Sequence, residues 1–158
     1  MITWIYQVNP EKLDVNGCLA EAPDRVAWWA GVAKYKQEMK PDDRVFIWRS
    51  KSNGAHGTSG IIAECAVDSI VATMPADPFT KHFSREPSPT ADIDRVWLRF
   101  TAIAEEDSVL SRDQIAQHEL LSKVGPLGFR AKTIYKVSSD QSQALTSLWI
   151  PRKKRSRS

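Results

Sequence analysis

The hydrophobic pattern predicts a chain of short strands with a few helices between them. Residues 44–49 form an almost continuous apolar run, which is typical of a central strand. Residues 94–105 alternate cleanly between apolar and polar positions, as a half-buried strand does. Similar signals predict further strands at residues 3–8, 60–73 and 130–137.

Helical spacing is clearest near the start of the chain. Asp24 is a suitable N-cap, and the apolar residues after it recur every three or four positions, which predicts a helix over residues 24–39. The positions on its predicted apolar face are Val26, Trp29, Val32, Tyr35 and Met39. Shorter helices are predicted at residues 14–20, 111–121 and 138–149, whereas 50–59 reads as a loop and 75–89, with four prolines, as irregular.

This element order predicts the fold class. Several consecutive strands with helices before, between and after them indicate an α+β fold with a mainly antiparallel sheet. Long strands that bend would suit a small, partly closed β-barrel with surrounding helices. At 158 residues the chain is long enough for one domain with a real core, which we place at residues 1–150, followed by a basic disordered tail at 151–158.

The net charge of +3 comes from that tail. Five basic residues lie in it: Arg152, Lys153, Lys154, Arg155 and Arg157. Without them the rest of the chain has 17 basic and 19 acidic residues, a charge of −2. Affinity for a phosphate backbone would therefore come mainly from the tail. It is either an arm that grips nucleic acid, or a localisation signal, or a disordered solubilising end.

Little in the sequence points to catalysis, a metal or a cofactor. The three histidines, His56, His82 and His118, are scattered, and none has metal-ligand spacing with cysteine or acidic residues. The two cysteines, Cys18 and Cys65, form no disulfide framework and are expected to be reduced, in a cytoplasmic protein. No apolar run approaches the ~20 residues of a membrane helix. We therefore expect a non-enzymatic protein without cofactor or membrane partner.

Three tryptophans within about twenty residues suggest a binding site. Trp28 and Trp29 precede the strand that ends in Trp48-Arg49-Ser50, and a glycine-bearing loop follows. Indole faces with a few fixed polar groups suit a flat, weakly charged ring, such as a nucleobase drawn out of its stack. The alternative is that the tryptophans are ordinary core residues.

Four sequence blocks together resemble an EVE domain, a PUA-like domain related to YTH and ASCH domains. These blocks are Trp4-Ile-Tyr-Gln-Val-Asn-Pro10, Trp29 shortly before Tyr35-Lys36, Arg44-Val-Phe-Ile-Trp-Arg-Ser50 and Gly60-Ile-Ile-Ala-Glu64. The resemblance extends to about Trp149. One departure is Asp42-Asp43, where the family usually has Gly-Asp, which costs the turn a glycine but touches no chemistry. The resemblance implies a PUA-like barrel whose hydrophobic pocket accepts a flipped, modified base of DNA or RNA.

For the pocket walls we select Trp29 and Trp48. Trp28 is the substitute for Trp29, because the two cannot both face inward on a helix. Ser50 and Gln7 are candidates for reading the Watson–Crick edge, since each can donate and accept hydrogen bonds, with end-of-strand capping as the alternative. Asn9 is a weaker candidate whose default role is in a turn.

Cationic residues near the pocket strand and in the tail are the candidates for backbone contact. They are Arg49, Lys51, Arg152, Lys153, Lys154 and Arg155. For Arg49 and Lys51 the alternative is a solvated charge.

The expected partner is DNA or RNA that carries a methylated or hydroxymethylated cytosine or a methylated adenine. A separate effector protein is a further candidate partner, because the chain has no nuclease or nucleotide-hydrolase motif. Two other functions stay open: an ASCH-like RNA-processing enzyme that uses His56 or His82, and a non-catalytic interaction subunit.

Overall fold

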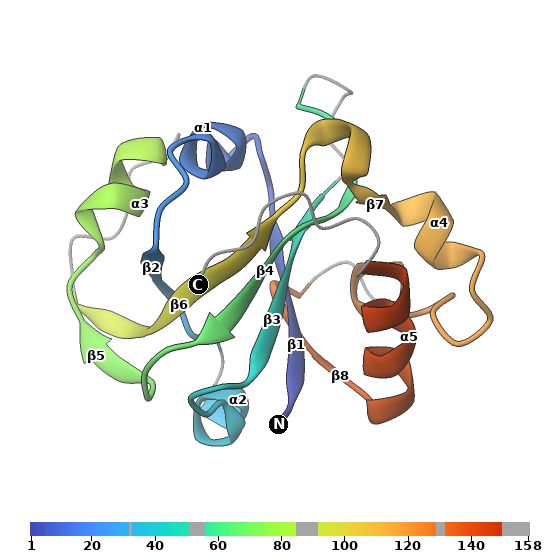
Figure 1. Cartoon of the computed structure of the whole chain (residues 1–158). Coiled ribbons are helices and arrows are strands. Elements are labelled where there is room, and N and C mark those ends of the chain that lie inside the picture. Colours follow the sequence, from blue (N-terminus) through green and yellow to red (C-terminus); the bar gives the residue numbers. More distant parts are fainter. Residues whose placement is uncertain (32, 51–55, 85–91, 129–131, 150–158) are drawn as a thin grey trace.

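The computed structural model describes residues 1–31, 33–50, 56–84, 92–128 and 132–149. Its centre is an eight-stranded sheet in which the strands follow the order β2-β6-β4-β3-β1-β8, with β5 and β7 paired beside that path (Figure 1). The strands are β1 (Thr3–Val8), β2 (Arg25–Trp29), β3 (Arg44–Arg49), β4 (Gly60–Val67), β5 (Ala72–Met74), β6 (Ile93–Ile103), β7 (Leu110–Ser111) and β8 (Ile134–Val137). Among the pairings of the described residues, β1–β3 alone is parallel.

Helices cover the sheet from both sides (Figure 1). They are α1 (Val15–Ala20), α2 (Ala33–Glu38), α3 (Pro78–Phe83), α4 (Arg112–Ala116) and α5 (Ser139–Trp149), with short 3₁₀ turns η1 (Glu106–Ser108) and η2 (Gly125–Leu127). The β3–β4 and β4–β6 registers each shift once, which bends these strands. Within the described residues no pairing joins β2 to β8, so the barrel stays partly open. The predicted α+β fold with a mainly antiparallel, partly closed barrel is confirmed.

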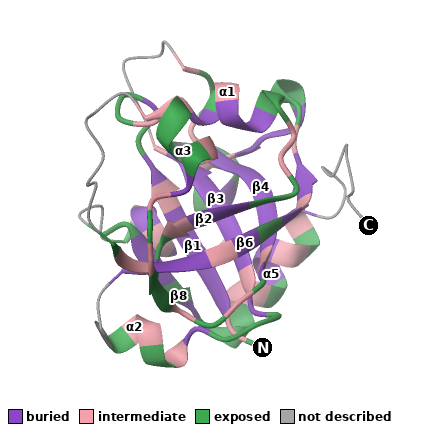
Figure 2. Cartoon of the chain, turned by 90° about the vertical axis from the view of Figure 1, so that its left-hand side faces the viewer, coloured by how far each residue is buried: buried purple, intermediate pink, exposed green. Residues whose placement is uncertain are grey.

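Strand alternation divides the buried residues between two cores. On β1 and β3, Trp4, Tyr6, Val45 and Ile47 belong to the core enclosed by the curved sheet. The intervening residues Ile5, Phe46 and Trp48 belong to a second core against α4 and α5. Figure 2 shows the resulting concentration of buried residues along the central strands.

The predicted helix over residues 24–39 is wrong. Arg25–Trp29 is strand β2, which pairs with β6 from Arg25↔Arg99 to Trp29↔Arg95, and the helix α2 begins only at Ala33. Gly31 lies between the two with a φ of 83°, a left-handed conformation that ends the strand and excludes a continuous helix. The backbone hydrogen bonds offered by β6 outweigh the helical spacing of the apolar side chains.

Other element boundaries differ less. The long strand predicted at 60–73 ends at Val67, and β5 follows after a turn. The stretch 75–89, predicted as irregular, contains α3, which Asp77 caps by accepting a hydrogen bond from the Phe79 N–H at 3.0 Å. The helix predicted at 111–121 ends at Ala116.

A buried carboxylate ties the start of the chain to the β3 turn. Asp43 accepts hydrogen bonds from the Ile2 N–H, the Lys40 N–H and the Trp4 indole N–H, each at 3.0 Å. Asp42 beside it has a φ of 73°, a left-handed conformation that glycine adopts without strain. Asp43 therefore holds the first residues of β1 against the turn that precedes β3.

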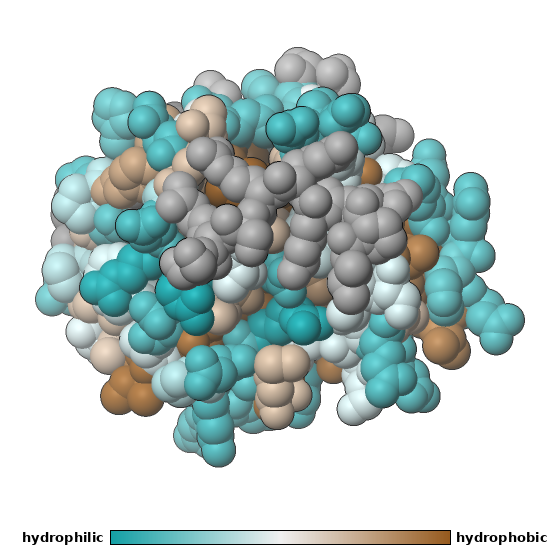
Figure 3. All heavy atoms as spheres, viewed as in Figure 1, coloured by the Kyte–Doolittle hydropathy of each residue, from teal (hydrophilic) through white to brown (hydrophobic). Residues whose placement is uncertain are grey.

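One face of the molecule is mostly polar. The face in Figure 3 is largely hydrophilic, with hydrophobic side chains in small separate areas. Among the described residues, no helix is both long and apolar enough to span a bilayer.

Candidate functional site

The parallel β1–β3 pair brings two strand ends to the same edge of the barrel. Val8 pairs with Arg49, and the Ser50 N–H donates to the Val8 carbonyl at 2.9 Å. The residues that follow each strand therefore open into one cavity of about 420 Å³, which we call the rim cavity. It is lined by Gln7, Val8, Asn9, Lys12, Leu13, Trp28, Ser50, Lys132 and Thr133.

Polar groups of defined position lie around the rim cavity. The Gln7 amide donates to the Lys132 carbonyl at 2.8 Å and to the Tyr135 hydroxyl at 3.4 Å, which fixes its orientation. The Asn9 Oδ1 accepts from the Glu11 N–H at 2.9 Å, the turn role expected of it. In the described part of the chain, the Asn9 Nδ2 and the Ser50 hydroxyl have no hydrogen-bond partner. Both can therefore bond to a ligand.

Burial raises the pKa of Tyr135, although hydrogen bonds from the Lys132 backbone and the Gln7 side chain act in the opposite direction. The Tyr135 hydroxyl is consequently neutral at physiological pH and presents a donor as well as an acceptor beneath Gln7.

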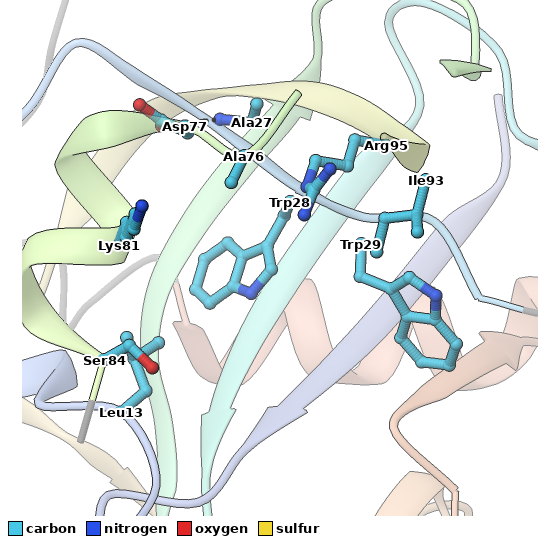
Figure 4. A pocket seen from close by; sticks show the side chains of 10 residues that line it. All are labelled: Leu13, Ala27, Trp28, Trp29, Ala76, Asp77, Lys81, Ser84, Ile93 and Arg95. Carbon is cyan, nitrogen blue, oxygen red and sulfur yellow. Dashed lines mark hydrogen bonds between the residues drawn. The ribbon is translucent and has the colours of Figure 1, made fainter. Parts of the chain in front are cut away.

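Trp28 contributes the aromatic wall. Its half-buried indole packs edge-to-face on Tyr6, with ring centroids 6.2 Å apart. It also borders a second cavity of about 420 Å³ at the free edge of β2, which we call the strand-edge cavity (Figure 4). That cavity is lined by Leu13, Ala27, Trp28, Trp29, Ala76, Asp77, Lys81, Ser84, Ile93 and Arg95.

Trp29 lies on β2 as well, not on a helix, and is 40% exposed. It lines the strand-edge cavity and a third, smaller cavity of about 320 Å³ with Tyr35, Lys34 and Lys132. Because neighbouring residues of a strand point to opposite faces, both tryptophans reach cavities at the sheet edge from different sides. The prediction that only one of Trp28 and Trp29 could reach a pocket assumed a helix, and it does not apply to a strand.

Trp48 is not in this site. Its indole is 1% exposed and packs in the second core with Phe46 and Ile61, and it lines none of the cavities around the tryptophan pair. The pleat of β3 explains this, because Trp48 shares a face with Phe46 and points toward α4 and α5. The placement of Trp48 as a pocket wall is therefore corrected to a core position.

Arg49 is not a surface cation but the centre of a group of polar contacts with Asn16, Thr58 and Glu106, which we call the Arg49 clip. Its buried guanidinium donates to the Thr58 carbonyl at 2.8 and 3.0 Å and to the Asn16 side chain at 2.7 Å, and it pairs with Glu106 at 2.8 Å. These bonds join β3 to α1, to the segment before β4 and to η1. Arg49 thus has no exposed face for a phosphate. Lys51, Arg152, Lys153, Lys154 and Arg155 lie outside the described residues.

The pKa of Glu106 reflects this clip. Partial burial raises it, but hydrogen bonds from Thr58 and Arg49 and the charge of Arg49 together outweigh burial and hold the pKa below its ordinary value. Glu106 therefore stays ionised and paired at physiological pH.

The two histidines considered for an RNA-processing enzyme, His56 and His82, do not line these cavities. His56 supplies only a backbone carbonyl to the Asn16 amide, at 2.9 Å, and His82 is exposed on α3, packed edge-on against Phe83. The described residues contain no group of three or more histidine, cysteine or acidic side chains placed to hold a metal ion.

Several residues that line the cavities were not predicted from the sequence. Lys132 and Thr133 come from the segment before β8, and Leu13 precedes α1. Only pairing of β1 with both β3 and β8 brings these segments together, and no local spacing in the sequence encodes that pairing. Arg95 and Lys81 were missed because they come from β6 and α3, which are distant in the sequence from the tryptophan pair on β2.

One protein-family model matches almost the whole chain. The model of the EVE domain matches residues 3–148. No curated protein sequence matches the chain significantly.

Solved structures with the same fold cover almost the whole chain. Human THYN1, in a complex with DNA containing 5-methylcytosine, is 16% identical with a TM-score of 0.59 over 95% of this chain and 98% of its own. Rpa0253 from Rhodopseudomonas palustris is 11% identical with a TM-score of 0.65 over 94% and 92%. The YTH domain of Mmi1, in a complex with RNA, is 12% identical with a TM-score of 0.53 over 99% and 84%.

Proposed function

Because this chain belongs to the EVE domain family, we propose that it is a nucleic-acid-binding module that accepts one modified base, flipped out of its stack, in the rim cavity beside Trp28. The module performs no chemistry on the base. Its ligand is DNA or RNA carrying a methylated or hydroxymethylated cytosine or a methylated adenine.

One observation carries the proposal. The rim cavity combines the Trp28 indole, onto which a base can stack, with the Asn9 Nδ2 and the Ser50 hydroxyl, which make no hydrogen bond to other described residues. Asn9 and Ser50 present donors and acceptors of the kind that distinguish amino from keto groups on a base edge. The complexes of THYN1 with 5-methylcytosine DNA and of the Mmi1 YTH domain with RNA support nucleic acid as the ligand.

The magnitudes decide where selectivity must come from. Stacking on Trp28 contributes ~1–3 kcal/mol for any base. Burial of one extra methyl group adds ~0.8 kcal/mol, about a fourfold preference. Selectivity beyond that must come from cavity shape and from the polar groups at Gln7, Asn9 and Ser50.

The test is a titration of short DNA and RNA oligonucleotides, each with and without a modified base. Trp28→Ala should weaken binding of the preferred modified oligonucleotide by about tenfold or more. Trp97→Ala is the matched control, because Trp97 is a half-buried indole on neighbouring β6 that lines none of these cavities. Equal affinity for modified and plain oligonucleotides would exclude the proposal, and so would equal effects of the two tryptophan substitutions.

For backbone contact we assign the tail cations Arg152, Lys153, Lys154 and Arg155, with Lys51 as a further contact; all five lie outside the described residues. The support is the charge distribution, since the rest of the chain is net negative. Removal of residues 151–158 should flatten the dependence of affinity on salt concentration while the preference for the modified base persists. An unchanged salt slope would remove the tail from the interface.

A further inference from the structure

The strand-edge cavity contains a buried cation whose hydrogen-bond donors are only partly satisfied by the described residues. Arg95 is 6% exposed and lines this cavity, which has a volume of about 420 Å³. Its Nη1 donates to the Met74 carbonyl at 2.7 Å. Within the described part of the chain this is its only side-chain hydrogen bond, and it has no ion-pair partner there.

This arrangement is unusual for a buried arginine. A guanidinium carries five N–H donors in a planar fork, and burial of a charge without partners is costly. Other buried charges in the same molecule are satisfied: the Arg49 guanidinium makes bonds to Thr58, Asn16 and Glu106. The donors that Arg95 retains therefore indicate an acceptor that the described residues do not supply.

The fold places the remaining N–H donors of the Arg95 guanidinium toward the cavity. Arg95 lies opposite Trp29 in the β2–β6 ladder and opposite Ala72 on β5, and the bond to Met74 holds one edge of the guanidinium. In Figure 4 the side chain points toward the two tryptophans rather than away from the cavity.

The local charges favour an anion. Lys81 of α3 adds a second positive group to the cavity wall. Asp77 is the one acidic side chain among the lining residues, and its two oxygens accept from the Ala27 and Phe79 N–H groups, both at 3.0 Å. Asp77 is thus engaged in holding α3 against the edge of β2, and the lining charges sum to +1.

We propose that the strand-edge cavity is an oxyanion subsite of the nucleotide ligand, with Arg95 as its specificity-determining residue. This inference rests on the proposed function, because Trp28 is a wall shared by the rim cavity and the strand-edge cavity. The oxyanion is a phosphate of the bound nucleotide or a carboxylate carried by its base. The planar fork of arginine matches the paired oxygens of either group.

The experiment compares small ligands by calorimetric titration. The probes are 5-methylcytidine and N6-methyladenosine, each as nucleoside and as 5′-monophosphate, and 5-carboxycytidine as a nucleoside. For the wild-type protein, the added oxyanion should improve affinity by about tenfold or more. Arg95→Met should abolish this gain and Arg95→Lys should retain part of it. Arg99→Met is the control, because Arg99 lies on the same strand but lines none of the three cavities, and its partly exposed side chain pairs with Asp68.

The probe that shows the gain identifies the source. A gain for the monophosphates that depends on Arg95 assigns the backbone phosphate, and a gain for 5-carboxycytidine that depends on Arg95 assigns an acidic base modification. The proposal is overturned if neither oxyanion improves binding, or if the gain survives in Arg95→Met.

A measurement on the wild-type protein guards against a folding defect in the variants. The NMR signal of the Arg95 Nε–H should shift when a monophosphate is added, and an unshifted signal at saturation contradicts the inference. The outcome is separable from that of the proposed function. The ratio of affinities for modified and unmodified bases tests the function, whereas the ratio for ligands with and without the oxyanion tests the subsite.

Discussion

Replacement of Asp43 by alanine should strongly destabilise the fold. The substitution leaves three donors without their acceptor: the Ile2 N–H, the Lys40 N–H and the indole N–H of Trp4, which is fully buried. Hydrogen bonds to charged groups contribute ~1.5–3 kcal/mol each. The two backbone bonds are only partly buried, so water can replace part of their contribution. We therefore expect a loss of ~3–4 kcal/mol in the free energy of unfolding.

Asp43→Asn should cost less, ~1.5–3 kcal/mol, because one amide oxygen still accepts hydrogen bonds while the amide NH₂ faces a donor. The assay is urea denaturation followed by tryptophan fluorescence. Domains of this size have ~5–15 kcal/mol of stability, so both variants should retain a measurable folded baseline.

Asp42→Asn is the matched control. Asp42 is adjacent but exposed, and its left-handed φ of 73° is one that asparagine tolerates. Its stability should stay within ~0.5 kcal/mol of the wild-type protein. The reasoning is refuted if Asp43→Ala costs less than ~1 kcal/mol, or if alanine and asparagine at position 43 are equally harmful.

Three further predictions concern single positions. Gly31→Ala should destabilise the protein by ~1–3 kcal/mol in the same urea assay, because φ is 83° and an added Cβ would lie 2.7 Å from the Ile134 Cδ1; a neutral effect would contradict this. Glu106→Gln should remove a pH-dependent part of the free energy of unfolding, because folding lowers the pKa of Glu106. The ionised Glu106 contributes fully to stability above the ordinary glutamate pKa of ~4.3. This contribution is lost as the pH falls through the lower pKa of the folded state. The stability difference between wild type and Glu106→Gln, measured from about pH 3 to pH 7, should therefore shrink at acid pH, and a constant difference would argue against the clip. Finally, burial raises the pKa of Cys18 to about 12, with the charges of Asp77 and Asp14 adding to it, and burial also raises that of Cys65. Thiol reagents at pH 8 should therefore modify the native protein only at its unfolding rate, as followed by mass spectrometry.

Local patterns were sufficient for the central strands. Residues 3–8 and 44–49 consist mostly of β-formers, and residues 93–103 alternate, so local patterns indicate these strands. The α3 helix could also have been found, since Asp77-Pro78 is an N-cap followed by a proline in the first turn.

The error at residues 24–39 has a physical origin. Val26 and Trp29 fit a helical face, yet they also lie in the β-forming run Val-Ala-Trp-Trp, and only the partner β6 decides between the two. Periodicity cannot register a partner that is about seventy residues away. Gly31 was the local signal against a helix.

The candidate site was predictable in part. Gln7, Asn9 and Ser50 do line one cavity, because they lie at the ends of the paired strands β1 and β3, and Trp28 reaches the same cavity from β2. Trp48 was misplaced because a nearly continuous apolar strand gives no indication of which face its residues take. Arg49 was misread because its partners Asn16 and Glu106 are far from it in the sequence.

The bond from the Gln7 amide to the Lys132 carbonyl spans 125 residues of chain. Entropy of loop closure disfavours such contacts until the segments between them are already organised, so the rim cavity should be among the last parts to assemble during refolding. Burial of the core tryptophans would then precede recovery of ligand binding. Binding activity, rather than fluorescence, would report that a refolding molecule has reached its final topology.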